Sequence, residues 1–141
     1  KVQETEEALV NGATEIDMVM AIGLYKAGSF AEVRKDIEMV VRAAAGRTVK
    51  VILESCLLTE KEIEDASIIS ADAGAAYVKT STGFSTGGAT VEAVAAMKRA
   101  VGDRCKIKAS GGIRTRDVAL LMIDAGASRI GTSSGVAIVN P

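Results

Sequence analysis

Two lysines stand near the carboxyl ends of successive β-rich runs, Lys79 in AYVKT (76–80) and Lys108 in KIKAS (106–110). A lysine that attacks a carbonyl must be neutral, and lowering its pKa from about 10.4 to about 7 requires roughly 4–5 kcal/mol. A second ammonium about 7 Å away supplies roughly 2.4 kcal/mol at an effective dielectric of about 20, and partial burial supplies the rest. The pair is therefore a candidate Schiff-base site.

Asp17, in the run EIDMVM (15–20), is the candidate group for moving protons beside this lysine pair. Lys50 and Lys106 also lie on charged strand faces, so spacing alone leaves them as rival nucleophiles. The chain has no histidine. That absence excludes histidine triads, histidine general bases and histidine-ligated zinc.

Two turns rich in glycine and serine follow the last two β-rich runs, SGGIRT (110–115) and GTSSGV (131–136). Free backbone N–H groups, and the start of the helix predicted after the first turn, could hold a phosphate. A phosphate site at the ends of two neighbouring strands is the recurrent arrangement of parallel barrels. We therefore expect phosphate between Gly111–Gly112 and Ser133–Ser134, and a tight turn without a ligand is the alternative.

A regular alternation of strands and helices must position these residues. Apolar residues at helical spacing separate the β-rich runs, which favours parallel strands joined by crossover helices. The residues expected to cap the helix starts are Thr59 with Glu62, Thr90 and Thr115. We predict five strands, at 15–20, 49–54, 76–80, 106–110 and 128–132, and left-handed glycines after helices at Gly12, Gly74 and Gly126.

Each predicted strand has one apolar face and one face that bears charge. In the run 106–110, for example, two lysines alternate with Ile107 and Ala109. An open parallel sheet would have helices on both faces, whereas a barrel turns the apolar faces toward the helices and the charged faces inward. Charge inside a barrel is costly unless it is paired or used. We therefore interpret the interior as functional, with a structural ion-pair network as the alternative.

The composition narrows the class of protein. With 17 Lys+Arg, 18 Asp+Glu, two Tyr and two Phe, the chain has a net charge of -1 and few aromatics, which argues against a nucleic-acid-binding surface. No apolar run approaches the ~18 residues of a membrane span. Cys56 and Cys105 fit no metal-ligand spacing and indicate reduced thiols in a cytoplasmic protein. We expect a single domain, 1–141, without a metal or cofactor.

Six motifs, in order, closely resemble the deoxyribose-phosphate aldolase family: EIDMV (15–19), VKVILE (49–54), VKTSTGF (78–84), GGAT (87–90), KASGGIRT (108–115) and RIGTSSGV (129–136). The resemblance implies a class I, metal-free aldolase on a TIM barrel, the α/β (β/α)8 fold. It also implies a small-molecule sugar phosphate as substrate. The family cleaves 2-deoxy-D-ribose 5-phosphate reversibly to acetaldehyde and D-glyceraldehyde 3-phosphate.

The same resemblance implies roles for individual residues. The Schiff-base lysine falls on Lys79, the second lysine that lowers its pKa falls on Lys108, and the proton-relay acid falls on Asp17. Some relatives carry a basic residue where Phe84 stands, so we expect one phosphate contact to be absent. The phosphate-binding positions fall on Gly83, Gly111, Gly112, Gly131, Ser133 and Ser134.

The five predicted strands look like strands 4 to 8 of that barrel. We therefore expect a partial TIM barrel of five parallel strands with outer helices and two open edges. We expect such a chain to have little aldolase activity alone and to associate through its edges as a homo-oligomer or aggregate. Two other functions stay open: a lysine-dependent barrel aldolase for a different sugar phosphate, and a non-catalytic half-barrel that binds phosphate or serves in assembly.

Overall fold

The computed structural model describes residues 1–140, in which five parallel strands form one sheet in chain order. They are β1 (Glu15–Val19), β2 (Thr48–Ile52), β3 (Tyr77–Lys79), β4 (Lys106–Ser110) and β5 (Arg129–Gly131). The predicted parallel strands are confirmed, with β1 and β5 at the two edges. Several strand ends differ from the predicted ones by one or two residues, because the alternation of faces extends beyond the residues that pair in the ladder.

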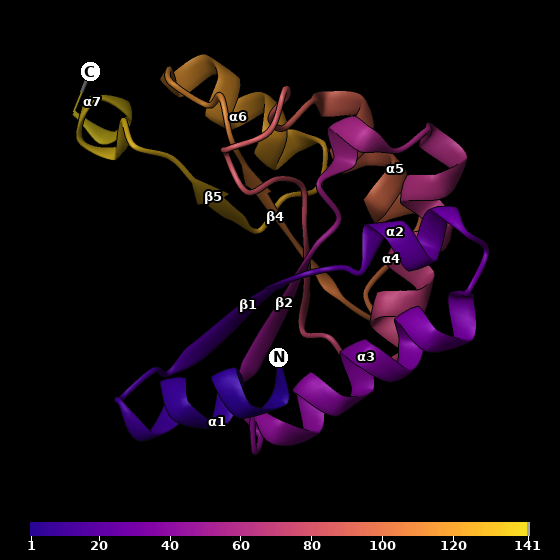
Figure 1. Cartoon of the computed structure of the whole chain (residues 1–141). Helices are drawn as coiled ribbons and strands as arrows, with labels where there is room; N and C mark the ends of the chain where they lie inside the picture. Colours follow the sequence, from indigo (N-terminus) through magenta and orange to yellow (C-terminus); the bar gives the residue numbers. More distant parts are fainter. Residues whose placement is uncertain (141) are drawn as a thin grey trace.

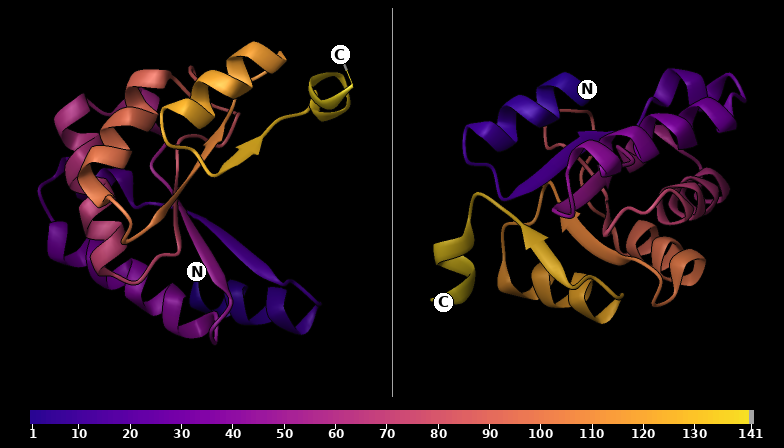
Figure 2. Two further views of the ribbon diagram at one scale, coloured as in Figure 1. Left: turned by 180° about the vertical axis from the view of Figure 1, so that it is seen from behind. Right: turned by 90° about the horizontal axis from the view of Figure 1, so that it is seen from below.

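Helices connect the strands and cover one side of the sheet. They are α1 (Val2–Val10), α2 (Ile22–Lys26), α3 (Phe30–Ala43), α4 (Glu60–Asp72), α5 (Val91–Val101), α6 (Arg116–Asp124) and α7 (Gly135–Val139), with a 3₁₀ turn, η1 (Ser55–Leu57). Figures 1 and 2 show α3 to α6 along the convex side of a curved sheet, whose concave side is open. The sheet and its helices therefore form an arc with one bare face.

The predicted helix boundaries have the expected chemistry. Thr59 and Glu62 form a reciprocal capping box at the start of α4. Thr90 and Thr115 cap α5 and α6, each accepting a hydrogen bond from a backbone N–H three residues later. The three glycines predicted after helices have positive φ angles, 96° at Gly12, 90° at Gly74 and 117° at Gly126. These predictions are confirmed.

The apolar core lies between the convex face of the sheet and the helices. Burial of each large aliphatic side chain there contributes about 1.5–3 kcal/mol. Cys105 belongs to this core, since its Sγ lies 3.2 Å from the carbonyl oxygen of Ala75 and burial raises the pKa of its thiol to about 11. The least exposed large apolar side chains are Ile37, Leu53, Met97, Ile107, Val33, Val40, Val49, Val51, Val78, Val94 and Val101.

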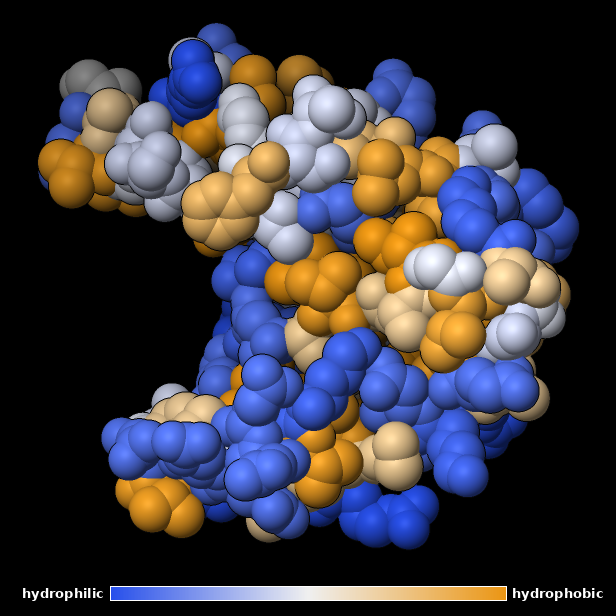
Figure 3. All heavy atoms as spheres, in the orientation of Figure 1, coloured by the Kyte–Doolittle hydropathy of each residue, from blue (hydrophilic) through white to orange (hydrophobic). Residues whose placement is uncertain are grey.

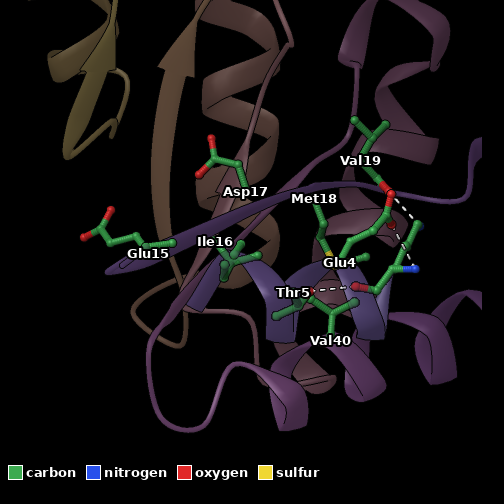
Figure 4. A pocket seen from close by; sticks show the side chains of 11 residues that line it. Glu4, Thr5, Glu15, Ile16, Asp17, Met18, Val19 and Val40 are labelled. Atoms are coloured by element: carbon green, nitrogen blue, oxygen red, sulfur yellow. Dashed lines mark hydrogen bonds and ion pairs between the residues drawn. The ribbon is translucent and has the colours of Figure 1, made fainter. Parts of the chain in front are cut away.

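The concave face carries the charged side chains, as predicted. Figure 3 shows a C-shaped outline whose hollow is lined mainly by hydrophilic residues. In Figure 4 the carboxylates of Glu15 and Asp17 leave β1 on one side, while Ile16 and Met18 point to the other. Lys50 lies on this open face but is nevertheless buried, with an exposed fraction of only 4%. Two carboxylates hold its ammonium group on the sheet.

An ion pair joins the first and last strands across the hollow. Arg129 Nη1 of β5 donates hydrogen bonds to both carboxylate oxygens of Glu15 of β1, at 3.0 and 2.7 Å. The same guanidinium lies over the ring of Tyr77, 4.7 Å from its centroid. The two edges of the sheet therefore touch through side chains although their backbones do not pair. None of the helices within residues 1–140 is long and apolar enough to cross a membrane.

Candidate active site

Asp17 lies between two lysine ammonium groups on the concave face. Lys79 Nζ of β3 donates a hydrogen bond to Asp17 Oδ2 at 2.6 Å. Lys50 Nζ of β2 donates to Oδ1 of the same carboxylate at 2.8 Å and also lies 2.7 Å from Glu15. The strand register explains the contact between Asp17 and Lys50, because the two residues are direct partners in the β1–β2 ladder. The structure thus brings the predicted Asp17 and Lys79 into contact.

The charges of this cluster shift the pKa values of its members. Burial raises the pKa of Asp17, but the hydrogen bonds from Lys50 and Lys79 outweigh it and hold this pKa below its ordinary value. Hydrogen bonds from Arg129 and Lys50 lower the pKa of Glu15 from 4.5 to about 2. Burial opposes the charge of Lys50, yet its two carboxylate partners raise its pKa. Lys50 is therefore held as a cation and is a poor nucleophile.

Lys108 lies next to Lys79 on the neighbouring strand. Their Cα atoms are partners in the β3–β4 ladder, and neighbouring strands lie about 4.8 Å apart. Both side chains line one cavity of about 500 Å³. Burial first, and then the positive charge of Lys79, lowers the pKa of Lys108. The structure therefore places a lowered amine pKa at Lys108, whereas the resemblance implied that Lys108 acts on the pKa of Lys79.

Lys106, the other rival nucleophile, does not line this cavity. It is exposed, and its ammonium lies over the ring of Tyr77, 5.9 Å from the centroid. The surroundings thus distinguish the two rival lysines: two carboxylates hold Lys50, whereas Lys106 is exposed and lies over the buried ring of Tyr77.

The two glycine-rich and serine-rich turns reach the same cavity as the lysines. Its lining includes Gly83, Gly111, Gly112, Gly131 and Ser133, but not Ser134. Within residues 1–140, the backbone N–H groups of Gly83, Gly111, Gly112 and Ser133 have no hydrogen-bond acceptor. The N–H of Ser134 instead donates to Thr132 Oγ1 at 2.9 Å. One cavity thus combines two lysine amines with backbone donors that no described protein atom uses.

Backbone geometry requires glycine in this part of the site. Gly111 and Gly112 have φ angles of 89° and 76°, which residues with a side chain rarely adopt. Gly88 packs directly on this turn, and a Cβ atom there would overlap the carbonyl group of Gly111. The N–H of Ala89 donates to the carbonyl oxygen of Gly111 at 3.0 Å. The GGAT segment (87–90) therefore fixes the position of the Gly111–Gly112 turn.

Some residues of the cavity lining were not among the predicted site residues: Thr82, Ser110, Ile113, Arg114 and Thr132. All of them lie inside motifs that the sequence analysis used, so their neighbours were the available signal. Arg114 adds a cation beside unbonded N–H groups, a combination that suits an anionic ligand. Among residues 1–140, no three His, Cys, Asp or Glu side chains gather closely enough to hold a metal ion.

Comparison with known families places this site in context. A family model described as DeoC/LacD family aldolase matches residues 1–140. The chain belongs to this family. Deoxyribose-phosphate aldolases of Brevibacillus brevis and Staphylococcus epidermidis are 58% and 59% identical to it over 139 residues. Each alignment covers 99% of this DeoC/LacD family chain and 63% of the relative, so the chain spans just under two thirds of the length of these curated relatives.

Solved aldolase structures have the same fold as this DeoC/LacD family chain. The deoxyribose phosphate aldolase of Aeropyrum pernix matches with a TM-score of 0.88 and 38% identity, over 99% of this chain and 59% of that one. An aldolase described as QR15 matches with a TM-score of 0.93 and 43% identity, over 97% and 62%. The five strands and their outer helices are therefore a partial TIM barrel, as predicted.

Proposed function

We propose that this protein is a class I deoxyribose-phosphate aldolase. It cleaves 2-deoxy-D-ribose 5-phosphate reversibly to acetaldehyde and D-glyceraldehyde 3-phosphate through a lysine Schiff base. The observation that carries the proposal is the single cavity lined by Lys79, Lys108 and the Gly111–Gly112 turn. Such a reaction needs an amine for the aldehyde carbon and an anion site for the phosphate. Family membership and the names of the relatives support the same substrate.

We assign the Schiff base to Lys79, because it contacts a carboxylate that can move protons. The Lys79 nitrogen forms a bond to C1 of the open-chain sugar, and a proton passes from nitrogen to the former carbonyl oxygen. Asp17, whose Oδ2 lies 2.6 Å from Nζ, is the group within reach for this transfer. A second proton, passed from the solvent through Asp17, converts this hydroxyl into water, which leaves, and an iminium remains on Lys79.

Asp17 also suits the step that breaks the carbon–carbon bond. Its pKa is lowered, so it is an ionised base at neutral pH. It accepts the proton of the C3 hydroxyl, the C2–C3 bond breaks, and the electron pair moves to the iminium to give an enamine. D-glyceraldehyde 3-phosphate leaves. The proton returns to C2, and water hydrolyses the imine to release acetaldehyde and free Lys79.

The presence of Lys108 favours the loss of one proton from the pair of amines, Lys79 and Lys108. Two ammonium groups that line one cavity repel each other, so the pair loses its first proton more easily than a single lysine would. Burial and the charge of Lys79 lower the pKa of Lys108. Because its pKa is lowered, Lys108 is the amine of the pair that passes on its own proton and then takes one from Lys79, which frees the Lys79 nitrogen for attack.

The phosphate of the substrate binds, in this proposal, at Gly83, Gly111, Gly112, Gly131 and Ser133, whereas the N–H of Ser134 is already bonded to Thr132 and does not contribute. Unbonded N–H groups and the nearby start of α6 favour an anion there. Arg114 lines the same cavity and adds a positive charge. Gly131 allows a close approach of β5 to β4, since a Cβ atom there would lie 2.8 Å from Ser110 Cβ.

Two other functions have an observation in their favour. The family description joins two aldolase names, which favours an aldolase for a different sugar phosphate as the second candidate. A comparison of sugar phosphates as substrates of the whole protein separates it from the first. The open five-stranded sheet favours a non-catalytic half-barrel that binds phosphate. Such a module has no reactive lysine.

Borohydride trapping with acetaldehyde tests the Schiff base directly on this chain. We expect an ethylated lysine in the peptide that contains Lys79, and Lys79→Ala should abolish it. Lys106→Ala is the matched control, because Lys106 lies outside the cavity lining, and this variant should be trapped like the parent. An adduct on Lys108 in the parent would overturn the assignment to Lys79. The complete lack of an adduct would favour the non-catalytic module.

We further propose that the protein acts in the cytoplasm, in deoxyribonucleotide catabolism, and forms homo-oligomers. The free thiols of Cys56 and Cys105 support a reducing compartment. The related aldolase of Aeropyrum pernix is described as tetrameric, which supports self-association. No nucleic acid or membrane partner enters the proposal.

A further inference from the structure

Glu54 is a buried and strained carboxylate directly after β2, and the reaction proposed above does not use it. Its exposed fraction is 6%. Its backbone has φ 44° and ψ 61°, a left-handed conformation that is uncommon for residues other than glycine, asparagine and aspartate. Buried glutamates are rare unless they are paired. Within residues 1–140 the partner of this carboxylate is Thr82 rather than a cation.

The carboxylate of Glu54 holds both hydrogen-bond donors of Thr82. Thr82 Oγ1 donates to Oε2 at 2.5 Å, and the Thr82 backbone N–H donates to Oε1 at 3.4 Å. Thr82 Oγ1 also accepts a hydrogen bond from the N–H of Phe84 at 3.1 Å. The loop therefore closes around Gly83, whose N–H has no acceptor among the described residues.

The strained backbone of Glu54 connects this loop to the lysine strand. The N–H groups of Leu53 and Ser55 donate to the carbonyl oxygens of Lys79 and Thr80, at 2.9 and 2.8 Å. The end of β2 is thus fixed against the residues that carry the proposed Schiff-base lysine. Between these two hydrogen bonds, Glu54 adopts its left-handed conformation, and its side chain reaches the Thr82 loop.

We propose that Glu54 is a positioning residue that shapes the anion site of the cavity. Its carboxylate holds the loop of Thr82, Gly83 and Phe84 in the conformation that leaves the Gly83 N–H for the phosphate of the substrate. A carboxylate close to an anion site repels the anion, which is electrostatically unfavourable. The two hydrogen bonds that Glu54 accepts from Thr82 compensate for this repulsion. The inference rests on the proposed function, because it explains how one of its binding loops is held.

Amide NMR of the whole 141-residue chain, with inorganic phosphate as the probe, tests this inference. In Glu54→Ala we expect the Thr82 amide to lose its protection against hydrogen exchange and the Kd for inorganic phosphate to rise about ten-fold. Glu54→Gln keeps one acceptor and should fall between. Thr82→Val should resemble Glu54→Ala, and the double variant should add little, because both changes remove one shared interaction. If Glu54→Ala does not fold, Glu54→Gln and Thr82→Val carry the test.

Glu62→Ala is the matched control. Glu62 also accepts a hydrogen bond from a threonine, the Thr59 N–H at 2.7 Å, but it lies outside the cavity lining. This variant should lose stability and keep the phosphate affinity of the parent. Parent-like protection and affinity in Glu54→Ala would overturn the positioning role and leave the proposed function intact. A parent chain that neither binds phosphate nor forms the borohydride adduct would overturn the proposed function, and the role of Glu54 with it.

Discussion

The protonation states of the lysines at the active site depend on which of them contacts a carboxylate. Asp17 contacts Lys50 and Lys79, and Lys50 has Glu15 as a second partner. Lys108 forms no ion pair within residues 1–140, and burial lowers its pKa. An amine whose pKa is lowered and an ionised carboxylate therefore lie near Lys79. This division of charge is what proton transfer during imine formation requires.

Removing Lys108 should slow the capture of an aldehyde at neutral pH. In Lys108→Ala we expect the rate of borohydride trapping at about pH 7 to fall about 50-fold, which corresponds to a like-charge repulsion of about 2.4 kcal/mol across about 7 Å. The rate should recover in part at alkaline pH, where hydroxide replaces the missing amine as the proton acceptor. The measurement is the pH profile of trapping for the parent and the variant. A variant that reacts as fast as the parent at neutral pH would remove Lys108 from the mechanism.

The sequence located single residues better than the contacts between them. Motifs and strand alternation were sufficient to place Lys79, Lys108 and the Gly111–Gly112 turn on one cavity. They could not show that Lys50 is held by Asp17, because that pairing depends on the register of two strands 33 residues apart. Glu54 was missed for a similar reason, since its left-handed backbone leaves no pattern in the sequence.

At the scale of elements, the packing of one loop on another shapes the anion site. Gly88→Ala should lower the free energy of unfolding by about 1–3 kcal/mol, because the new methyl group would overlap the backbone of the Gly111 turn. Gly23→Ala is the matched control: Gly23 lies in α2, and apart from its chain neighbours and the backbone of its own helix no atom lies within 4 Å of the position that a methyl group would occupy there. Its replacement should be neutral or stabilise by up to about 1 kcal/mol. Urea unfolding measures both, and equal effects would contradict the packing argument.

The ion pair between β1 and β5 should make stability depend on pH. Arg129 and Lys50 lower the pKa of Glu15 from 4.5 to about 2, so the unfolded chain binds a proton there before the folded chain does. The stabilisation is complete above pH 4.5 and is lost as the pH falls toward 2. Glu15→Gln cannot titrate. It should be less stable at neutral pH and lose less stability across this window. Urea midpoints that fall in parallel for both proteins would argue against this role.

Long elements were predictable and short ones were not. The helical spacing of apolar residues and the threonine caps identified α3 to α6, because each of these helices presents a full apolar stripe to the sheet. α2 and α7 have five residues each, too few to establish a helical period. The sequence of α7, GVAIV, also has a glycine and three β-branched residues, which have weak helix propensity.

At the scale of the whole molecule, the open edges should promote self-association of the 141-residue chain. Next to edge strand β5, helices α6 and α7 line an apolar cavity of about 510 Å³ that includes Leu120, Ile123 and Val139. These side chains are 46%, 49% and 70% exposed, an apolar surface that favours association. Sedimentation velocity should show oligomers, and Leu120→Glu with Ile123→Glu should reduce them. A parent chain that is a stable monomer with full aldolase turnover would contradict this prediction.

The barrel class was predictable, but the curvature of the sheet was not. Charged strand faces and crossover helices pointed to a barrel because an open sheet would bury the same charge under helices. The contact between Arg129 and Glu15 spans 114 residues and depends on how strongly the five strands coil. Strand patterns carry no measure of that coiling, so the sequence could not indicate that the two edges meet through side chains.

Because Cys105 is buried, the rate at which its thiol reacts can measure how often the core opens. Its thiol has a pKa of about 11, whereas a hydrogen bond with Ser85 lowers the pKa of the exposed Cys56. An alkylating reagent at neutral pH therefore modifies Cys56 in the native protein and reaches Cys105 only when the layer between sheet and helices separates. Once Cys56 is blocked, the alkylation rate of Cys105 reports how often that layer opens, without any denaturant.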